Sequence, residues 1–219
     1  RRSSDLIDFH ERIEIELRTV ITSAGFGKRE QNKSEKLARI ISAARTLLES
    51  SGESGVTTAQ VAKSAEVAAG TLFLYAKNKG ELLLLAQNAD YRLALHEGIQ
   101  QSEGASSLNE AVQALWDAIF RCNRKHVENG RAYLREVMFG DPEEPNRAEA
   151  LSLMTATGAQ TEKLLCKFLT VTPDDANTRA QSISSSAYVV LSSPLTVKFA
   201  IDDLLQMFMA QIQPSLRLT

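Results

Sequence analysis

The chain has 219 residues, of which 43% are hydrophobic and 24% charged, as is typical of a globular protein. No apolar run approaches the ~20 residues of a membrane-spanning helix, and the acidic start does not resemble a signal peptide. Two cysteines without CxxC spacing and three scattered histidines provide no metal site and no enzyme motif. We therefore expect a cytoplasmic protein that is not an enzyme, holds no metal or cofactor, and has no membrane partner.

The net charge of −2 is unevenly distributed along the chain. Basic and acidic residues balance over residues 1–32, residues 33–79 carry a net charge of +3, and residues 80–219 carry −5. A contact with nucleic acid is therefore expected within residues 33–79, since phosphate would be repelled by the remainder.

The first predicted element is an amphipathic helix over residues 5–22. Its apolar residues are spaced 3, 4, 4 and 3 apart, which places them on one stripe: Leu6, Phe9, Ile13, Leu17 and Val20. The sequence TSAGFGKREQN then predicts a linker, so that residues 1–32 form an N-terminal extension. The stripe favours packing on the chain's own bundle or on a partner subunit, while the basic linker residues leave a contact with the DNA backbone open.

Residues 33–79 predict a helix-turn-helix domain. A helix over 34–50 is followed by SSGESG, by a short helix capped by Thr57, by a turn at 65–67, and by a second short helix over 69–75. A long helix over 81–101 comes next. Two short helices joined by a tight turn are typical of a unit whose second helix lies in the major groove of DNA.

Small residues at the start of the second short helix would let its backbone approach phosphate, and Thr71 could also touch a thymine methyl group. Tyr75 could bond a phosphate. Lys79 could neutralise another, since a cation at a helix start is otherwise unfavourable. The residues predicted to contact DNA are Lys33, Thr57, Thr58, Ala69, Gly70, Thr71, Phe73, Leu74, Tyr75 and Lys79.

Residues 34–83 resemble the DNA-binding domain of the TetR family of transcriptional regulators. The resemblance rests on the pattern TTxxVAxxAxVxxGTLFxYxxxKxELL, which keeps its spacing over some thirty residues. It departs from the family at Glu66 in place of a turn glycine, Ala68 in place of a capping serine, Phe73 in place of a tyrosine, and Ala76 in place of an aromatic residue. The resemblance implies C-terminal helices that form a ligand pocket and a dimer interface.

Residues 80–219 predict a ligand-binding and dimerisation domain that is an antiparallel helical bundle. After the helix over 81–101, its segments are 108–129, 131–139, 146–169, 175–191 and 195–213. The fold class is therefore all-α. Cys122 and Cys166 both fall in apolar helical patterns and are expected to be buried free thiols.

Aromatic and methionine residues of the bundle are candidates for the wall of a ligand cavity, although such residues are more often plain core. The candidates are Trp116, Phe120, His126, Tyr133, Met138, Phe139 and Met154, with Asp117, Cys122, Arg135, Glu136 and Gln160 as possible polar contacts.

The last two helices, about 175–213, are predicted to form the interface of a homodimer. Their sequence predicts more apolar surface than one subunit should expose, from Ala187, Val190, Leu191, Leu195, Phe199, Leu204, Leu205, Phe208 and Met209.

The resulting hypothesis is a repressor that is released from double-stranded operator DNA by a small, largely hydrophobic effector. Two alternatives stay open. One is a DNA-binding protein controlled by a protein partner, and the other is a dimeric helical interaction module that no longer binds DNA.

Overall fold

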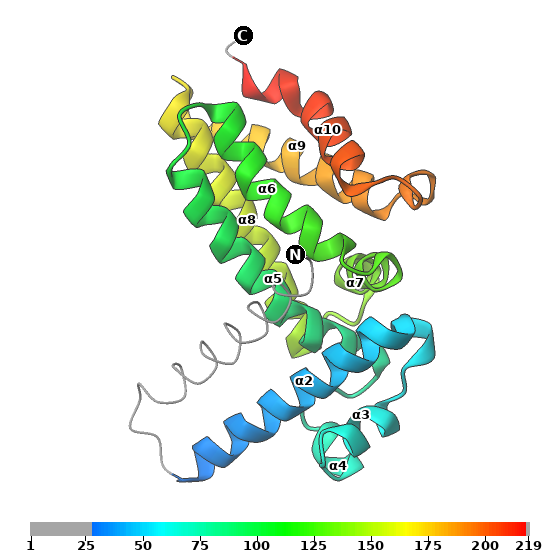
Figure 1. Cartoon of the computed structure of the whole chain (residues 1–219). Helices are drawn as coiled ribbons and strands as arrows, with labels where there is room; N and C mark the ends of the chain where they lie inside the picture. The colour runs from blue at the N-terminus through cyan, green and yellow to red at the C-terminus, as the bar shows by residue number, and fades with distance from the viewer. Residues whose placement is uncertain (1–27, 218–219) are drawn as a thin grey trace.

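The structure is a computed structural model that describes residues 28–217, and within them the chain is helical throughout with no strand (Figure 1). This confirms the all-α prediction. The helix predicted over 5–22 lies outside the described residues. Among the helices of residues 28–217, none has both the length and the hydropathy needed to cross a membrane.

The helices of the predicted DNA-binding domain form one end of the molecule. They are α2 (Lys28–Gly55), α3 (Thr58–Ser64) and α4 (Ala69–Leu72). Helix α2 includes residues 28–32, which had been predicted to belong to a linker, because KREQNKSEK contains good helix formers and neither glycine nor proline. The helix is kinked at Gly52, whose φ of 67° lies in the left-handed region.

The bundle consists of six α-helices and two short 3-10 turns within the described residues. The elements are α5 (Lys79–Glu103), α6 (Leu108–Arg124), α7 (Val127–Phe139), α8 (Pro145–Phe168), α9 (Pro173–Ser192), η1 (Pro194–Thr196), α10 (Ile201–Ile212) and η2 (Gln213–Leu216). Helix α5 runs from the DNA-binding helices into the bundle and packs along α6 (Figure 1).

Three predicted helix boundaries in the bundle were wrong, and one of them is the start of the helix predicted over 131–139, which begins at Val127. The helix predicted over 108–129 ends at Arg124, because the Nδ1 atom of His126 caps the next helix by accepting from the Asn129 amide. The helix predicted over 195–213 begins only at Ile201. Before it, η1 is held by the Thr196 hydroxyl, which donates to the Val190 carbonyl at 2.7 Å.

The hydrophobic core consists of two clusters that meet along α5. The smaller cluster joins α2, α3 and α4 to the start of α5, and the larger one fills the bundle. Leu82, Leu83 and Leu85 belong to the smaller cluster, whereas Leu84 belongs to the larger one. Helix α5 therefore contributes side chains to both clusters. A displacement of α5 affects both regions.

Most of the apolar residues predicted for a dimer interface are instead buried within this chain. Six of them lie in the bundle core: Ala187, Val190, Leu191, Leu204, Leu205 and Phe208. Helix α10 packs on α9 and α6, and its apolar face is buried in these contacts. Leu195 and Phe199 remain exposed, at 84% and 50%. The argument from excess apolar surface was therefore wrong for most of its residues.

Candidate DNA-binding surface and ligand cavity

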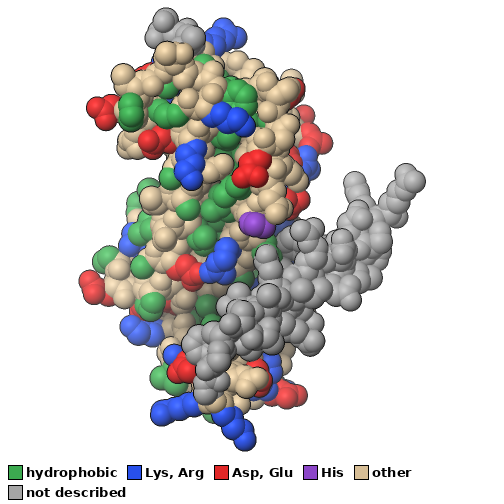
Figure 2. Space-filling model, turned by 90° about the vertical axis from the view of Figure 1, so that its left-hand side faces the viewer, with side chains coloured by type: hydrophobic (Ala, Val, Ile, Leu, Met, Phe, Trp, Pro, Cys, Tyr) green, Lys and Arg blue, Asp and Glu red, His purple; other side chains and the backbone are tan. Residues whose placement is uncertain are grey.

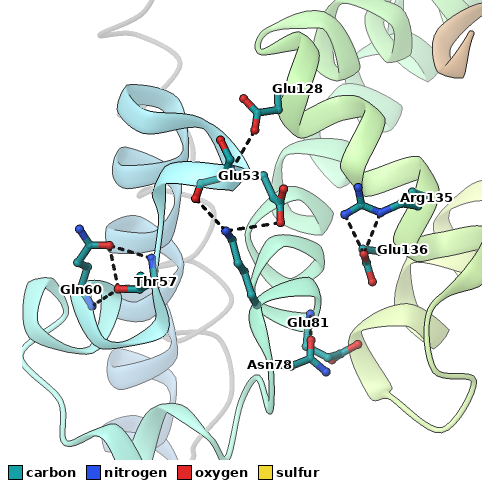
Figure 3. Close-up of polar contacts among 10 residues, drawn as sticks. Glu53, Thr57, Gln60, Asn78, Glu81, Glu128, Arg135 and Glu136 are labelled. Atoms are coloured by element: carbon teal, nitrogen blue, oxygen red, sulfur yellow. Dashed lines mark hydrogen bonds and ion pairs between the residues drawn. The ribbon is translucent and has the colours of Figure 1, made fainter. Parts of the chain in front are cut away.

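The first helix of the helix-turn-helix is fixed by a capping box between Thr57 and Gln60. The Gln60 amide donates to the Thr57 hydroxyl oxygen at 3.2 Å, and the Thr57 amide donates to Gln60 Oε1 at 2.8 Å (Figure 3). This satisfies two backbone donors that would otherwise lack partners. The side chain of Thr57, predicted to contact DNA, thus has a structural role in the free protein.

The turn between α3 and α4 adopts a backbone conformation that is energetically unfavourable for the residue at its centre. Glu66 adopts a φ of 54°, the left-handed region in which the family usually places glycine. Ala68 occupies the N-cap position of α4 and makes no side-chain cap. The Val67 amide donates to the Ala62 carbonyl at 3.0 Å, which closes the turn without help from either side chain.

Helix α4 has an inner face of core residues and an outer face of small and apolar ones. Leu72 and Ala76 are buried against α2 and α3, whereas Phe73 is 47% and Leu74 82% exposed. A Cβ atom at Gly70 would meet nothing within 4 Å. Intramolecular packing therefore does not explain the glycine.

Two side chains predicted to bind phosphate have partners within the protein. The Tyr75 hydroxyl donates to the Lys33 carbonyl at 3.2 Å. Lys79 Nζ donates to the Ser54 carbonyl at 3.2 Å and lies 3.7 Å from the carboxylate of Glu53 (Figure 3). These contacts hold the segment after α4 and the start of α5 to the two ends of α2.

Exposed basic side chains lie on α2 and α3, the helices beside α4, together with the exposed acidic residues Glu35 and Glu66. Lys33, Lys36 and Lys63 are exposed, and Lys and Arg side chains project from the lower end of the face shown in Figure 2, the end that the DNA-binding helices form. Lys77 is also exposed but lies 3.3 Å from Glu144. A positive rim around an apolar centre suits the phosphates on either side of a groove.

The bundle contains a cavity of about 310 Å³ between α5, α6, α7, α8 and α9. None of the described side chains that line it carries a charge. The lining residues are Tyr91, Trp116, Ile119, Asn123, Leu134, Met138, Met154, Ser184, Ser185, Ala187, Tyr188, Val189 and Leu191. Its volume is at the lower end of ligand sites, which are typically about 300–1,000 Å³.

Three of the predicted ligand contacts line this cavity: Trp116, Met138 and Met154. Tyr133 and His126 line a smaller polar pocket next to it, together with the buried ion pair between Arg45 and Asp90. Phe120 is buried against the ring of Phe208, and Phe139 is 79% exposed.

The polar candidates mostly have other partners. Asp117 pairs with Arg121, and Arg135 with Glu136 (Figure 3). Cys122 lies in the polar pocket, where burial raises the pKa of its thiol to about 12. Cys166 is exposed, so the prediction of a buried thiol was wrong there, because it lies on the outer face of α8.

Sequence reasoning missed the contribution of α9 to the cavity. Ser184, Ser185 and Tyr188 supply hydroxyl groups, and Ala187 supplies space. The stretch SISSSAYVV has no simple apolar stripe, so its inward face could not be identified from periodicity. Among the residues that the structure describes, no group of three or more His, Cys, Asp or Glu side chains could hold a metal ion.

A buried polar network connects the bundle with the end of α4. The side-chain amide of Asn146 in α8 donates to the Tyr75 carbonyl at 2.8 Å and to the carboxylate of Glu81 at 2.6 Å. Asn88 in α5 donates to the Asn146 carbonyl at 2.8 Å and accepts from the Tyr133 hydroxyl at 3.0 Å.

The network reaches the cavity through two stacked rings. Tyr133 stacks on Tyr91, with 6.2 Å between ring centroids, and Tyr91 lines the cavity. The Tyr91 hydroxyl lies 3.0 Å from that of Thr157. The cavity is thus connected, through Tyr91, Tyr133, Asn88 and Asn146, to the backbone just after α4, the predicted recognition helix.

Glu81 is the charged member of this network and is almost fully buried. Desolvation raises its pKa, and the two hydrogen bonds from Asn146 oppose that shift. A buried carboxylate of this kind depends on its donors, so Asn146 stabilises both the junction and the charge within it.

Comparison with known proteins agrees with this geometry. Residues 40–86 match the model of the family described as bacterial regulatory proteins, tetR family. No curated protein matches the sequence significantly.

Several solved structures share the fold. A TetR transcriptional regulator from Rhodococcus sp. RHA1 is 18% identical, with a TM-score of 0.67 over 84% of this chain and 97% of that one. The regulator FadR from Bacillus subtilis, solved in complex with stearoyl-CoA, is 15% identical, with a TM-score of 0.61 over 82% and 99%. A fatty acid metabolism regulator from Clostridium perfringens is 22% identical, with a TM-score of 0.53 over 83% and 100%.

Proposed function

We propose that this chain, a TetR-family transcription regulator with a helix-turn-helix DNA-binding domain, is a repressor that an uncharged hydrophobic ligand releases from its operator. The observation that carries the proposal is the cavity of about 310 Å³ in the bundle, lined without charge and connected by buried hydrogen bonds to the end of α4. The outer face of α4, with its basic surroundings, is the proposed contact with double-stranded DNA.

The lining of the cavity defines the ligand's chemistry. Trp116, Met138 and Met154 offer apolar and polarisable surface, and the hydroxyls of Ser184 and Tyr188 offer a few hydrogen bonds. A charged group would lose its hydration there without a counter-charge. The part of the ligand inside the cavity is therefore neutral and mostly hydrocarbon.

An acyl chain is one ligand of this kind. The FadR neighbour from Bacillus subtilis was solved with stearoyl-CoA, and an acyl-CoA bound here would place its hydrocarbon chain in the cavity and its phosphates outside. A neutral apolar molecule with no such head group fits the same lining. Long-chain acyl-CoA and the corresponding fatty alcohol are therefore the first pair to compare.

Release follows if the ligand favours an arrangement of α5 that the DNA complex does not. A ligand that displaces Tyr91 acts on Tyr133, on Asn88 and, through Asn146, on the Tyr75 carbonyl. The loss of DNA affinity then equals the ligand's differential affinity for the two arrangements. In a homodimer, which we propose also for this chain, the same motion would change the spacing of the two recognition helices.

The first test is binding of the purified protein to the DNA flanking its own coding region and to random duplex DNA, over a series of salt concentrations. Specific binding that weakens steeply with salt supports the proposal. Binding no tighter than to random duplex DNA, followed by no enrichment from a random library, would favour the interaction module that no longer binds DNA. Specific binding that no apolar compound weakens would favour control by a protein partner.

A matched pair of variants tests the DNA-binding surface itself. Gly70→Ala and Gly104→Ala each add a Cβ atom where nothing lies within 4 Å, so both should fold. Gly104 ends α5 at the far end of that helix. We expect Gly70→Ala alone to weaken DNA binding, about tenfold, because the added methyl group meets the DNA backbone. Equal affinities of the two variants would contradict a DNA contact at Gly70.

A further inference from the structure

The recognition helix lacks the side chains that usually read bases by hydrogen bonding. Residues 68–75 are AAGTLFLY, with no Arg, Lys, Asn, Gln, Asp or Glu. Bidentate hydrogen bonds to guanine and adenine come from Arg, Lys, Asn and Gln, and cytosine is read by Asp and Glu. Of the two hydroxyls in this stretch, that of Tyr75 already donates to the Lys33 carbonyl.

The same surface exposes two large apolar side chains. Leu74 is 82% and Phe73 is 47% exposed, and both lie beyond the last residue of α4 in a continuing helical turn, where the Leu74 amide donates to the Thr71 carbonyl at 3.2 Å. They lie three and four positions after Gly70, which places all three on one face. That face therefore presents an apolar ridge beside a position with no side chain.

We infer that Phe73 and Leu74 read the methyl groups of thymines in the major groove, so that the operator is recognised at A·T pairs mainly by apolar contact. The C5-methyl group is the one apolar feature that base pairs present in that groove, and apolar side chains recognise it. The inference rests on the proposed DNA binding and specifies what the recognition helix reads.

The charges around the ridge favour DNA over another protein as its occupant. Lys33, Lys36 and Lys63 are exposed on the neighbouring helices α2 and α3, and residues 33–79 carry a net charge of +3 even with the exposed Glu35 and Glu66 included, while the other residues of the chain sum to −5. Duplex DNA offers phosphates on both sides of a groove that contains apolar methyl groups. An exposed apolar patch within a basic rim matches that arrangement.

The test removes the methyl groups without changing the base-pairing sequence. Operators are selected from a random duplex library, and the enriched sequence is amplified with dTTP or with dUTP, so that every amplified thymine becomes uracil. Each buried methyl contributes about fourfold to affinity, so the uracil operator should bind at least tenfold more weakly. The salt dependence should be the same for both operators, because the phosphates are unchanged.

Variants assign the effect to residues. Leu74→Ala should bind the thymine operator more weakly and discriminate less between thymine and uracil, whereas Leu74→Met should retain discrimination. Leu151→Ala removes another exposed leucine, on α8 and outside the apolar ridge, and should leave the thymine-to-uracil ratio unchanged. Leu74 is too exposed for its removal to unfold the protein, and thermal unfolding checks this.

The outcomes separate the inference from the proposed function. Enrichment of an operator that binds equally well with uracil would overturn thymine reading and leave DNA binding intact. Discrimination that persists undiminished in both Leu74→Ala and Phe73→Ala would also overturn it, because the methyl groups would then be read elsewhere. If no duplex is enriched, the proposed function itself fails. A loss of discrimination confined to these two variants would support the inference.

Discussion

The core beneath the DNA-binding helices and the core of the bundle are filled by different kinds of side chain. The first contains many alanines, among them Ala44, Ala62 and Ala76, with branched aliphatic residues between them. The second contains the large rings of Trp116, Phe120 and Phe208. Short helices joined by a tight turn must approach closely, which small side chains allow.

The two regions also differ in the empty space between their side chains. The cavity of about 310 Å³ is lined only by residues of α5 to α9. The rings of Phe120 and Trp116 meet that of Phe208 at angles of 38° and 52°, and of these three residues Trp116 also lines the cavity. The molecule therefore combines a compact unit of short helices with a bundle that contains a cavity, and α5 and the Asn146 network lie between them.

The largest effect is expected where the two regions join. Asn146→Ala removes both donors of its side-chain amide and leaves the buried Glu81 carboxylate with backbone bonds alone, from Asn146 at 3.3 Å and from Arg147. We expect a loss of about 3 kcal/mol in the free energy of unfolding, measured by urea denaturation.

Two further variants check that the loss arises from the buried charge. Asn177→Ala removes an exposed asparagine that bonds Glu162 at 3.2 Å and should cost under about 0.5 kcal/mol. Glu81→Gln should partly restore the stability of Asn146→Ala. If the double variant loses as much stability as Asn146→Ala alone, the buried carboxylate is not the cause of the loss.

A smaller effect is expected from filling the cavity. Ala187→Leu adds three carbon atoms on its wall and should stabilise the bundle by about 1–2 kcal/mol. The uncharged dye Nile red should bind the parent protein and bind this variant more weakly, with DNA affinity unchanged. Ala148→Leu, on the exposed face of α8, is the control and should leave dye binding as it was. Undiminished dye binding by Ala187→Leu would show that the dye sits elsewhere.

Removing the strain in the turn of the DNA-binding domain should raise the free energy of unfolding by about 1 kcal/mol. Glu66→Gly removes the cost of a left-handed conformation from a residue with a φ of 54°. Glu66→Ala keeps that cost and removes only the exposed ion pair with Arg39, 3.8 Å long, which is worth little. Thermal unfolding should therefore rank the glycine variant above the parent and the alanine variant near it. Equal stability of the two variants would exclude strain at this turn.

The smallest effect is a dependence of the free energy of unfolding on pH. Burial raises the pKa of Glu81, so its protonated form is favoured by folding and the associated stability is lost as the pH rises through that pKa. Glu81→Gln stays neutral, so its advantage over the parent protein should grow from pH 4.5 towards neutrality. The unfolding free energies of the two proteins over this range test the prediction. A constant difference would show that Glu81 titrates normally.

Local sequence patterns determined the helix-turn-helix of this protein. The spacing of VAxxAxVxxGTLFxY identified the helix-turn-helix, and the turn residue Glu66 and the uncapped Ala68 lie where the sequence placed them. Signals of this kind act over a few residues, through helix periodicity, capping and backbone conformation. They therefore remain visible in a single sequence.

Tertiary structure alone decided which apolar side chains face a cavity, a core or solvent. Trp116 lines the cavity, Phe120 is buried against Phe208, and Phe139 is exposed, although all three share the same aromatic character. The link from Asn146 to the Tyr75 carbonyl spans 71 positions of sequence. Such placements depend on how long helices pack against one another, and no local pattern encodes that packing.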